Sequence, residues 1–168
     1  MPDLGHLRTP RPPWIALLVK KGAAPLELAS ASAGLLVRAL DGGQCGTKDA
    51  LLAELARAFE FPRYFGGNWD ALEECLTDLD WLSADGYLLV VDRADRLLRT
   101  RPEDYAMFVK IARSVGRAWA TSLSGVGARP ARPFHVVLTV GGAAAASGRD
   151  WRVPRLSLRT PPRDAGRR

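Results

Sequence analysis

Short runs of apolar residues alternate with longer segments of helical periodicity along this chain. Four of these runs have the length of strands, and most are uninterrupted: Trp14–Val19, Leu35–Leu40, Tyr87–Val91 and Phe134–Val140. Uninterrupted apolar runs are typical of strands buried on both faces, as in parallel sheets. The sequence therefore predicts an α/β fold, with a small parallel sheet of three strands, an extra N-terminal strand at Trp14–Val19, and flanking helices.

Three segments between these strands predict helices. Thr47 can cap the first, in which Leu51, Leu52, Leu55, Ala58 and Phe59 recur at helical spacing. Asn68 is a good N-cap for the second, Trp69–Leu79, which carries one apolar stripe. The third, Glu103–Ala120, follows Pro102 and has acidic residues at its start, where the helix dipole favours them.

The two ends of the chain differ in composition from its middle. Residues 1–13 contain four prolines and no apolar periodicity, and residues 143–168 are rich in Ala, Gly, Arg and Pro. We therefore expect a disordered lead over residues 1–13, one domain over residues 14–142, and a disordered or weakly ordered Arg/Pro-rich tail over residues 143–168.

The positive charge is concentrated at the C-terminal end. The 168 residues include 24 Lys or Arg and 18 Asp or Glu, a net of +6, and residues 144–168 contribute seven arginines and two aspartates to it. The remaining residues hold a net charge of only +1. A basic face for nucleic acid that covers the whole domain is therefore not indicated.

Neither the apolar runs nor the cysteines indicate a membrane-spanning or secreted protein. No stretch reaches the ~18 apolar residues that a membrane span needs, and the first residues lack the order of a secretion signal. The two cysteines, Cys45 and Cys75, make neither a disulfide framework nor a metal cluster. We expect a soluble, cytoplasmic protein with no membrane partner.

Motifs for catalysis and cofactor binding are missing from the sequence. It has no Walker loop, no GxGxxG after a strand and no HExxH. Of its two histidines, His6 lies in the lead. The other, His135, lies in a strand, where we expect a core histidine whose hydrogen bonds are satisfied. Cys45 is expected to be exposed in a Gly-rich turn, and Cys75 to be a small buried residue beside carboxylates that raise its pKa. Asp92 and Asp95 are explained by a strand end and a helix cap. No enzyme activity, metal or cofactor is predicted.

One helix carries a concentrated negative charge. Asp70, Glu73, Glu74, Asp78 and Asp80, here called the acidic surface, lie between Asn68 and Trp81 with no basic residue among them. Three interpretations compete: a solvated helix face, a carboxylate pair for acid–base or metal chemistry, and a rigid anionic surface that docks into a cationic cleft. Aromatic residues around Gly66 and Gly67 favour docking. Tyr64 is expected to be exposed, and at least one of Phe65 and Trp69 to lie in the core.

Residues 61–79, FPRYFGGNWDALEECLTDL, resemble the signature of the barstar family of ribonuclease inhibitors. That signature has an apolar residue and Pro, an aromatic pair and Gly, then Asn, Asp-Ala-Leu and Cys-Leu-Thr. The resemblance extends more loosely from about Leu35 to Val140 in the same order of elements. It implies a small parallel sheet with helices, no cofactor and no catalysis, and inhibition by carboxylates that occupy the place of substrate phosphates.

The resemblance also implies a set of contact residues. Asp70 matches the first inhibitory Asp of the family, and Glu74 stands where the family has its central Asp. Tyr64 matches a contact tyrosine, and Glu73 replaces a contact tryptophan. With Gly66 and Asn68 of the matching loop, the implied nuclease-binding residues are Tyr64, Gly66, Asn68, Asp70, Glu73 and Glu74.

Two functions remain open from the sequence. The first is a ribonuclease inhibitor that plugs the active site of a small secreted-type guanyl-specific ribonuclease with acidic phosphate mimics. The alternative is a barstar-fold module for RNA binding or regulatory protein interaction that uses the basic C-terminal tail. The residues of that tail are spaced singly among prolines, which makes RNA contact through it weak.

Overall fold

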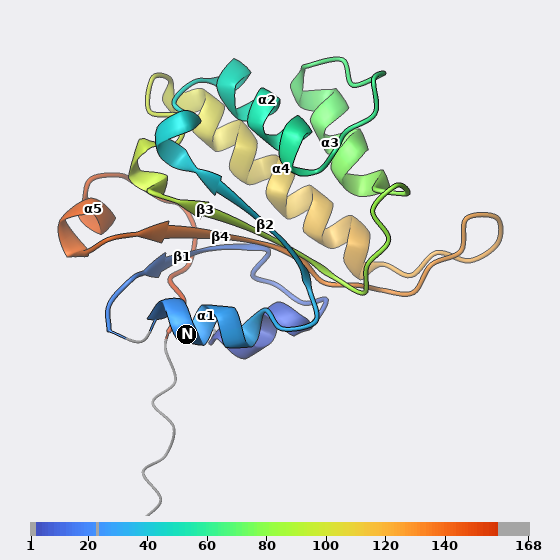
Figure 1. Cartoon of the computed structure of the whole chain (residues 1–168), viewed down its shortest axis with the longest axis horizontal. Helices are drawn as coiled ribbons and strands as arrows, with labels where there is room; N and C mark the ends of the chain where they lie inside the picture. Colours follow the sequence, from blue (N-terminus) through green and yellow to red (C-terminus); the bar gives the residue numbers. More distant parts are fainter. Residues whose placement is uncertain (1–2, 23, 158–168) are drawn as a thin grey trace, which may run out of the picture.

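A computed structural model describes residues 3–22 and 24–157. Its centre is a four-stranded sheet in the order β1-β4-β3-β2, in which every neighbouring pair is parallel (Figure 1). The strands are β1 (Ile15–Val19), β2 (Leu36–Asp41), β3 (Tyr87–Asp92) and β4 (Phe134–Val140). The predicted α/β fold is confirmed, and the extra N-terminal strand β1 lies at one edge of the sheet.

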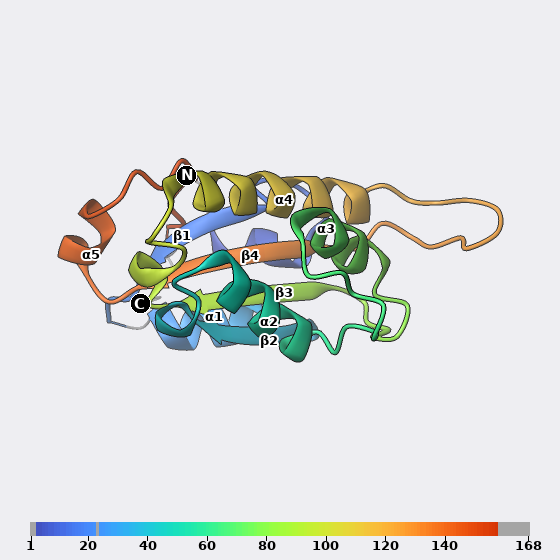
Figure 2. The ribbon, with the colours of Figure 1, turned by 90° about the horizontal axis from the view of Figure 1, so that it is seen from above.

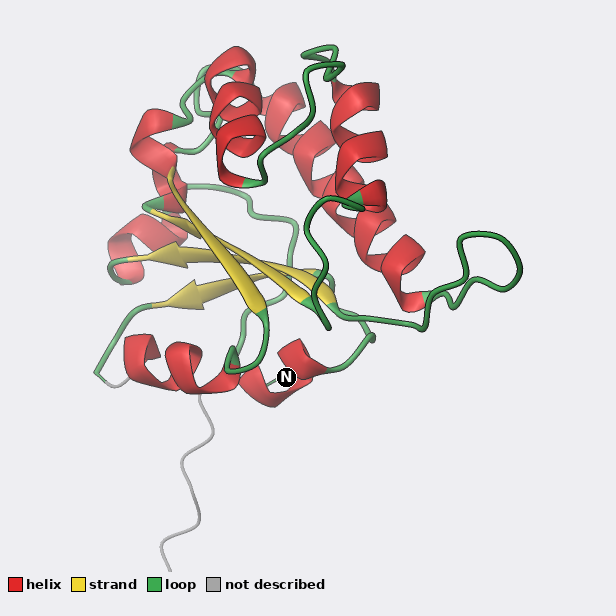
Figure 3. Ribbon diagram, turned by 45° about the vertical axis from the view of Figure 1, so that its right-hand side comes forward, coloured by secondary structure: helices red, strands yellow, loops and turns green. Residues whose placement is uncertain are grey.

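Helices cover both faces of this sheet (Figures 1 and 3). One face carries α2 (Lys48–Ala58), α3 (Trp69–Asp78) and α4 (Pro102–Ala120), and the other carries the 3-10 helix η1 (Leu4–Arg8) and α1 (Ala24–Ala31). The remaining helices are short: η2 (Gly42–Gln44), η3 (Ala94–Arg96) and α5 (Ala143–Ser147). Among the described residues, none of the helices combines the length and the apolar character of a membrane span.

Local sequence explains where the helices on the first face begin. Thr47 accepts a hydrogen bond from the Ala50 N–H at 3.2 Å, and Asn68 accepts one from the Ala71 N–H at 2.8 Å. Each bond satisfies a donor that the first turn of a helix leaves free. Pro102 opens α4, where its missing N–H costs no intrahelical bond.

The main core lies between the sheet and the helices α2, α3 and α4. All seven residues of β4 are buried, as expected for a central strand covered on both faces. Tyr87, Phe59, Phe108 and Phe134 are its largest fully buried side chains. A smaller cluster on the opposite face joins Leu4 and Leu7 to apolar residues of β1, β3 and β4.

The N-terminal residues 3–13 are ordered, so the expected disordered lead is wrong for this part of the chain. Leu4 and Leu7 of η1 are buried at 6% and 1% exposure. The ring nitrogens of His135 lie 2.8 Å from the Thr9 carbonyl oxygen and 3.0 Å from that of Pro13. The expectation failed because Leu4 and Leu7 are only two apolar residues among prolines, too few to show a helical periodicity in the sequence. In the structure both pack in the cluster on the second face of the sheet.

The C-terminal segment is also ordered as far as Ser157, where a disordered or weakly ordered tail was expected. Trp151 is buried, and its indole N–H donates to the Ala146 carbonyl oxygen at 2.7 Å. The Leu156 N–H donates to the Leu17 carbonyl oxygen at 2.8 Å. This segment therefore covers part of the β1 edge, and the rest of the expected tail, residues 158–168, lies outside the described residues.

Candidate functional site

Helix α3 separates apolar and acidic residues onto opposite sides. Leu72, Cys75 and Leu76 are buried against the core, and Leu79 follows them in the left-handed conformation that ends the helix. Asp70, Glu74, Asp78 and Asp80 are exposed. The predicted N-cap, Asn68, fixes the start of the helix, so the acidic surface is held on a rigid element.

Asp70 and Glu74 are exposed carboxylates that form no ion pair within the described residues. Their spacing of four residues places their Cβ atoms about 5–6 Å apart on one helix face. With Glu73 and Thr77 they line a shallow groove. Within the described residues, neither carboxylate has a hydrogen bond or an ion pair with another side chain. Both are therefore free to meet cations of another molecule.

Glu73 faces the protein more than its two neighbours do. It is half-buried and accepts a hydrogen bond from the Ser114 hydroxyl of α4. This bond connects the two helices that pack side by side in Figure 2. Of the three acidic residues that the resemblance assigned to nuclease binding, Glu73 is therefore the one already engaged within the fold.

The loop before α3 places an aromatic side chain beside the acids. Tyr64 is 71% exposed, as predicted, whereas Phe65 and Trp69 are partly buried against the core. Desolvation contributes most to raising the pKa of Tyr64, and nearby negative charges raise it further, with Asp78 the largest among the charges. Tyr64 therefore lies near the C-terminal end of the acidic surface.

Backbone conformation in this loop requires glycine at one position. Gly67 has φ +67°, in the left-handed region, directly before the N-cap Asn68. The preceding Gly66 lies close enough that an added Cβ would be 3.4 Å from the Asn68 side-chain nitrogen. The two implied binding residues Gly66 and Asn68 thus lie together at the start of α3, four and two residues before Asp70.

A hollow of about 720 Å³ lies between the C-terminal end of α3 and the loop of residues 121–133. Figure 2 shows this loop projecting beyond the end of the sheet. Glu74, Asp78, Asp80, Arg129 and Arg132 line the hollow together with the exposed apolar residues Leu123 and Val126. Burial and the neighbouring Asp80 raise the pKa of Asp78 above the usual range of a carboxyl group. The hollow therefore combines both signs of charge.

Arg129 was missed as a site residue from the sequence. Its guanidinium lies 3.6 Å over the Trp119 ring, and its Nη1 donates to the Thr77 carbonyl oxygen of α3 at 2.9 Å. The bond to Thr77 joins residues 52 positions apart, and together the two contacts fix the root of the loop against the acidic surface. No local pattern marks this contact, since Arg129 belongs to a Gly-, Ser- and Pro-containing segment.

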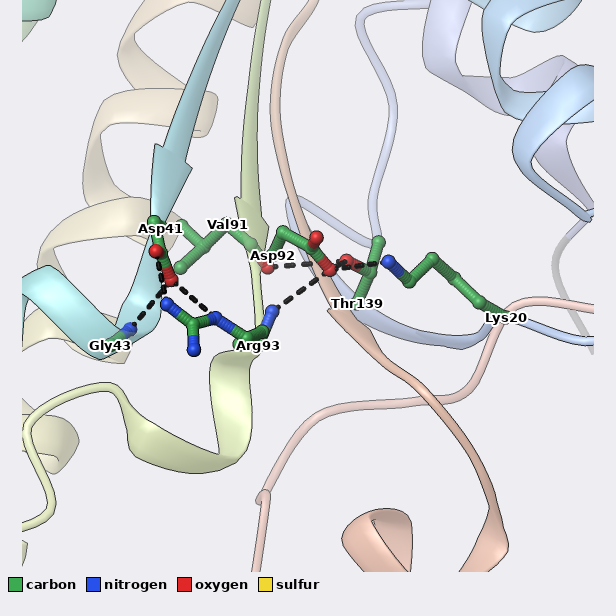
Figure 4. Close-up of polar contacts among 7 residues, drawn as sticks. All are labelled: Lys20, Asp41, Gly43, Val91, Asp92, Arg93 and Thr139. Atoms are coloured by element: carbon green, nitrogen blue, oxygen red, sulfur yellow. Dashed lines mark hydrogen bonds and ion pairs between the residues drawn. The ribbon is translucent and has the colours of Figure 1, made fainter.

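Charged residues also meet at the carboxyl ends of the strands, where ligands of open α/β sheets usually bind (Figure 4). Lys20 forms an ion pair of 2.7 Å with Asp92, which also accepts a hydrogen bond from Thr139 at 2.8 Å. Arg93 pairs with Asp41. Burial would raise the pKa of Asp92, but the bonds from Lys20, Thr139 and the Arg93 N–H outweigh it and lower the pKa. These charges are therefore balanced within the fold.

Neither cysteine has the surroundings of a reactive thiol. Cys45 is fully buried, so the expected exposure is wrong, because η2 and η3 pack around it and its carbonyl accepts the Leu98 N–H at 2.8 Å. Burial raises the pKa of Cys45 to about 11. Cys75 is buried as predicted, and burial, then Asp78 and Glu74, raise its pKa.

Two further sequence assignments have a structural outcome. His135 is a satisfied core histidine, as predicted. Asp92 ends β3, whereas Asp95 lies within η3 and caps no helix. Among the described residues, no group of three or more His, Cys, Asp or Glu side chains could hold a metal ion.

Comparison with solved structures shows a likeness in fold alone. The chain aligns with the ORC2 protein of Aeropyrum pernix, solved as ADPNP and ADP complexes, at 15% identity and a TM-score of 0.53 over 80% of this chain and 37% of that one. It aligns with Cdc6p from Pyrobaculum aerophilum at 18% identity and a TM-score of 0.50 over 78% of this chain and 33% of that one. The chain thus spans about a third of the length of these proteins.

Sequence comparison identifies the family. No curated protein matches the chain. The family model described as Barstar (barnase inhibitor) matches residues 35–139. This range runs from the start of β2 almost to the end of β4 and includes the whole acidic surface. Because it covers more than half of the chain, the protein belongs to the Barstar family.

Proposed function

We propose that this protein inhibits a small secreted-type guanyl-specific ribonuclease by placing the acidic surface in its active site. The observation that carries the proposal is the pair Asp70 and Glu74, two exposed carboxylates on a capped helix that form no ion pair in the described residues. A ribonuclease active site gathers cations around the phosphates of its substrate. Two fixed carboxylates can occupy the same positions.

The rigidity of α3 supports this role. Side chains on a capped helix that packs on α4 lose little backbone freedom when a partner binds, so less of the interaction energy is spent on ordering. Close charge pairs that are desolvated in such an interface contribute several kcal/mol, of the order of 2–5 for each truncated partner. Association driven by opposite charges is also fast and sensitive to salt.

The other residues of the site have distinct roles in this proposal. Tyr64, exposed beside Asp78, supplies an aromatic contact at the edge of the acidic surface. Gly66 and Asn68 shape the loop that leads into α3. Glu73 contributes negative charge and, through Ser114, holds α3 against α4.

The proposed inhibitor acts by occupancy and carries out no reaction. The family description names an inhibitor, and Asp70 and Glu74 need only their charge for this role. Two buried thiols whose pKa is raised fit a reducing compartment such as the cytoplasm.

A direct test measures RNA cleavage by a purified small secreted guanyl-specific ribonuclease in the presence of the protein. The proposal expects stoichiometric inhibition at low salt that weakens as salt is raised from 50 to 500 mM. A control with pancreatic-type ribonuclease, which differs in fold and active site, separates specific inhibition from RNA shielding. Cleavage by the guanyl-specific enzyme at the uninhibited rate would contradict the proposal.

A further inference from the structure

A second charged surface, of opposite sign, lies on α4. Lys110, Arg113 and Arg117 fall at i, i+3 and i+7 of this helix, so they share one side of it. No acidic residue occurs between Tyr105 and Ala120. Like charges three or four residues apart destabilise a helix slightly, and the two carboxylates of α4, Glu103 and Asp104, lie in its first turn, six or more residues before Lys110.

The C-terminal segment adds a fourth cation to this side of α4. Arg113 Nη2 donates to the Arg152 carbonyl oxygen at 2.6 Å, which holds the two segments together. Arg152 and the three α4 cations line a hollow of about 210 Å³ whose other lining residues are Ala106 and Val109. These four cations, Lys110, Arg113, Arg117 and Arg152, are here called the basic surface.

The charges of the basic surface are largely unbalanced. Among the described residues, no carboxylate lines its hollow, and Lys110, Arg113 and Arg117 form no ion pair. Arg152 has one contact, 3.5 Å from Asp150, between side chains that are 66% and 80% exposed. Such an exposed pair contributes little and is readily exchanged for another anion.

The arrangement of the cations indicates the kind of anion. Lys110 and Arg117 are seven residues apart, about 10 Å along the helix axis. Cations set out in a row suit a chain of phosphates better than a single phosphate, which would require donors that converge on one point. The shallow apolar floor of Ala106 and Val109 leaves room for a sugar–phosphate backbone beside the helix.

We propose that the basic surface binds the phosphate backbone of single-stranded RNA. The choice of RNA over DNA rests on the proposed function, since the enzyme to be inhibited acts on RNA. Lys110 also lines a hollow with Asp70 and Glu73, so the basic surface borders the acidic one. The protein thus holds the substrate of the nuclease beside the surface that blocks its active site.

This proposal moves RNA binding from the end of the chain to α4. The sequence placed such binding in the tail of residues 143–168. Arg152 of that tail lies against α4, and Arg149 stacks on the Tyr105 ring at 4.5 Å. Residues 158–168, which hold four further arginines, lie outside the described residues. The contributions of the tail and of the basic surface to RNA binding are therefore measured with separate variants.

Fluorescence anisotropy with a fluorescein-labelled 20-nucleotide uridine RNA tests the proposal without any nuclease. Three full-length variants are compared with the parent: K110Q/R113Q/R117Q on the basic surface, the control K21Q/R57Q/R96Q on other exposed cations, and R159Q/R163Q/R167Q/R168Q in the tail. The first two lose the same charge, so they separate position from net charge. Thermal unfolding of each variant checks that the fold is kept.

We expect the basic-surface variant to bind RNA at least about tenfold more weakly at 50 mM salt, and the control variant to stay within about twofold of the parent. For the parent, four phosphate contacts give a slope of log K against log salt near −3, and the basic-surface variant should fall to about −1. Equal losses in these two variants, a loss confined to the tail variant, or no binding by the parent would overturn the proposal. A basic-surface variant that binds RNA as the parent does but binds anionic phospholipid vesicles more weakly would also overturn the proposal. Since the anisotropy measurement contains no nuclease, the RNA affinities can be interpreted even if the proposed inhibition is not observed.

Discussion

The hydroxyl of Ser114 on α4 donates a hydrogen bond to the carboxylate of Glu73 on α3. This contact joins the acidic surface to the longest helix of the fold, across 41 residues of sequence. Glu73 is half-buried, whereas Asp70 and Glu74 beside it are exposed. One acidic residue therefore orients the helix, and two others face outward from it.

Replacing the donor of this bond should weaken the fold more than the inhibition. Ser114→Ala leaves the half-buried carboxylate of Glu73 without its partner, which costs about 1–2 kcal/mol. Urea unfolding of the variant should show a lower midpoint with an unchanged m-value. An unchanged midpoint would mean that the Glu73–Ser114 bond does not stabilise the packing of α3 on α4.

Because α4 packs closely on the N-terminal segment, adding one methyl group at Gly116 should have a strong effect on stability. A Cβ added to Gly116 would lie 2.6 Å from the Trp14 ring, so Gly116→Ala should destabilise by about 1–3 kcal/mol through overpacking. Gly141→Ala is the matched control, because nothing lies within 4 Å of its Cβ position. Thermal unfolding of both variants measures the difference, and equal melting temperatures would contradict the packing described here.

His135 predicts a pH dependence of stability. Burial lowers its pKa to about 4 in the fold, where the His6 ring lies 4.8 Å away, while the unfolded chain titrates near the ordinary value of about 6.5. Between these two pH values the unfolded state binds a proton that the native state does not. The free energy of unfolding should therefore fall by on the order of 3 kcal/mol as the pH decreases from 6.5 to 4.

The contribution of His135 can be isolated by substitution. His135→Gln carries no titrating group, so the difference in unfolding free energy between parent and variant should shrink steadily from pH 7 to pH 4. Urea unfolding at each pH gives this difference. A difference that stays constant over the range would show that His135 does not titrate as its burial requires.

Features encoded in adjacent residues could be predicted from the sequence. Asn68 lies next to the helix that it caps, and the apolar stripe and acids of α3 repeat within ten residues, so both the helix and its exposed acids follow from local pattern. The strands are equally local, because each is one short apolar run. Tyr64 was predicted to be exposed for the same reason, from its place in a short glycine-containing loop.

Features that depend on distant partners could not be predicted in this way. The N-terminal residues are ordered by contacts such as that of Thr9 with His135, and the C-terminal segment by the pairing of Leu156 with Leu17. Arg129 reaches α3 through Thr77, and Arg152 reaches α4 through Arg113. In each pair the partner is dozens of residues away, so neither residue shows a local periodicity that reveals the contact.

The most direct test of the account compares inhibition by three isosteric variants against a small secreted guanyl-specific ribonuclease. Asp70→Asn and Glu74→Gln each remove one charge from the acidic surface, and Asp85→Asn removes one from an exposed residue in the loop before β3. We expect the first two to raise the inhibition constant about 30-fold or more, equivalent to about 2 kcal/mol, and Asp85→Asn to change it less than about twofold. Equal inhibition by all three variants and the parent would contradict the claim that Asp70 and Glu74 occupy the phosphate sites of the nuclease.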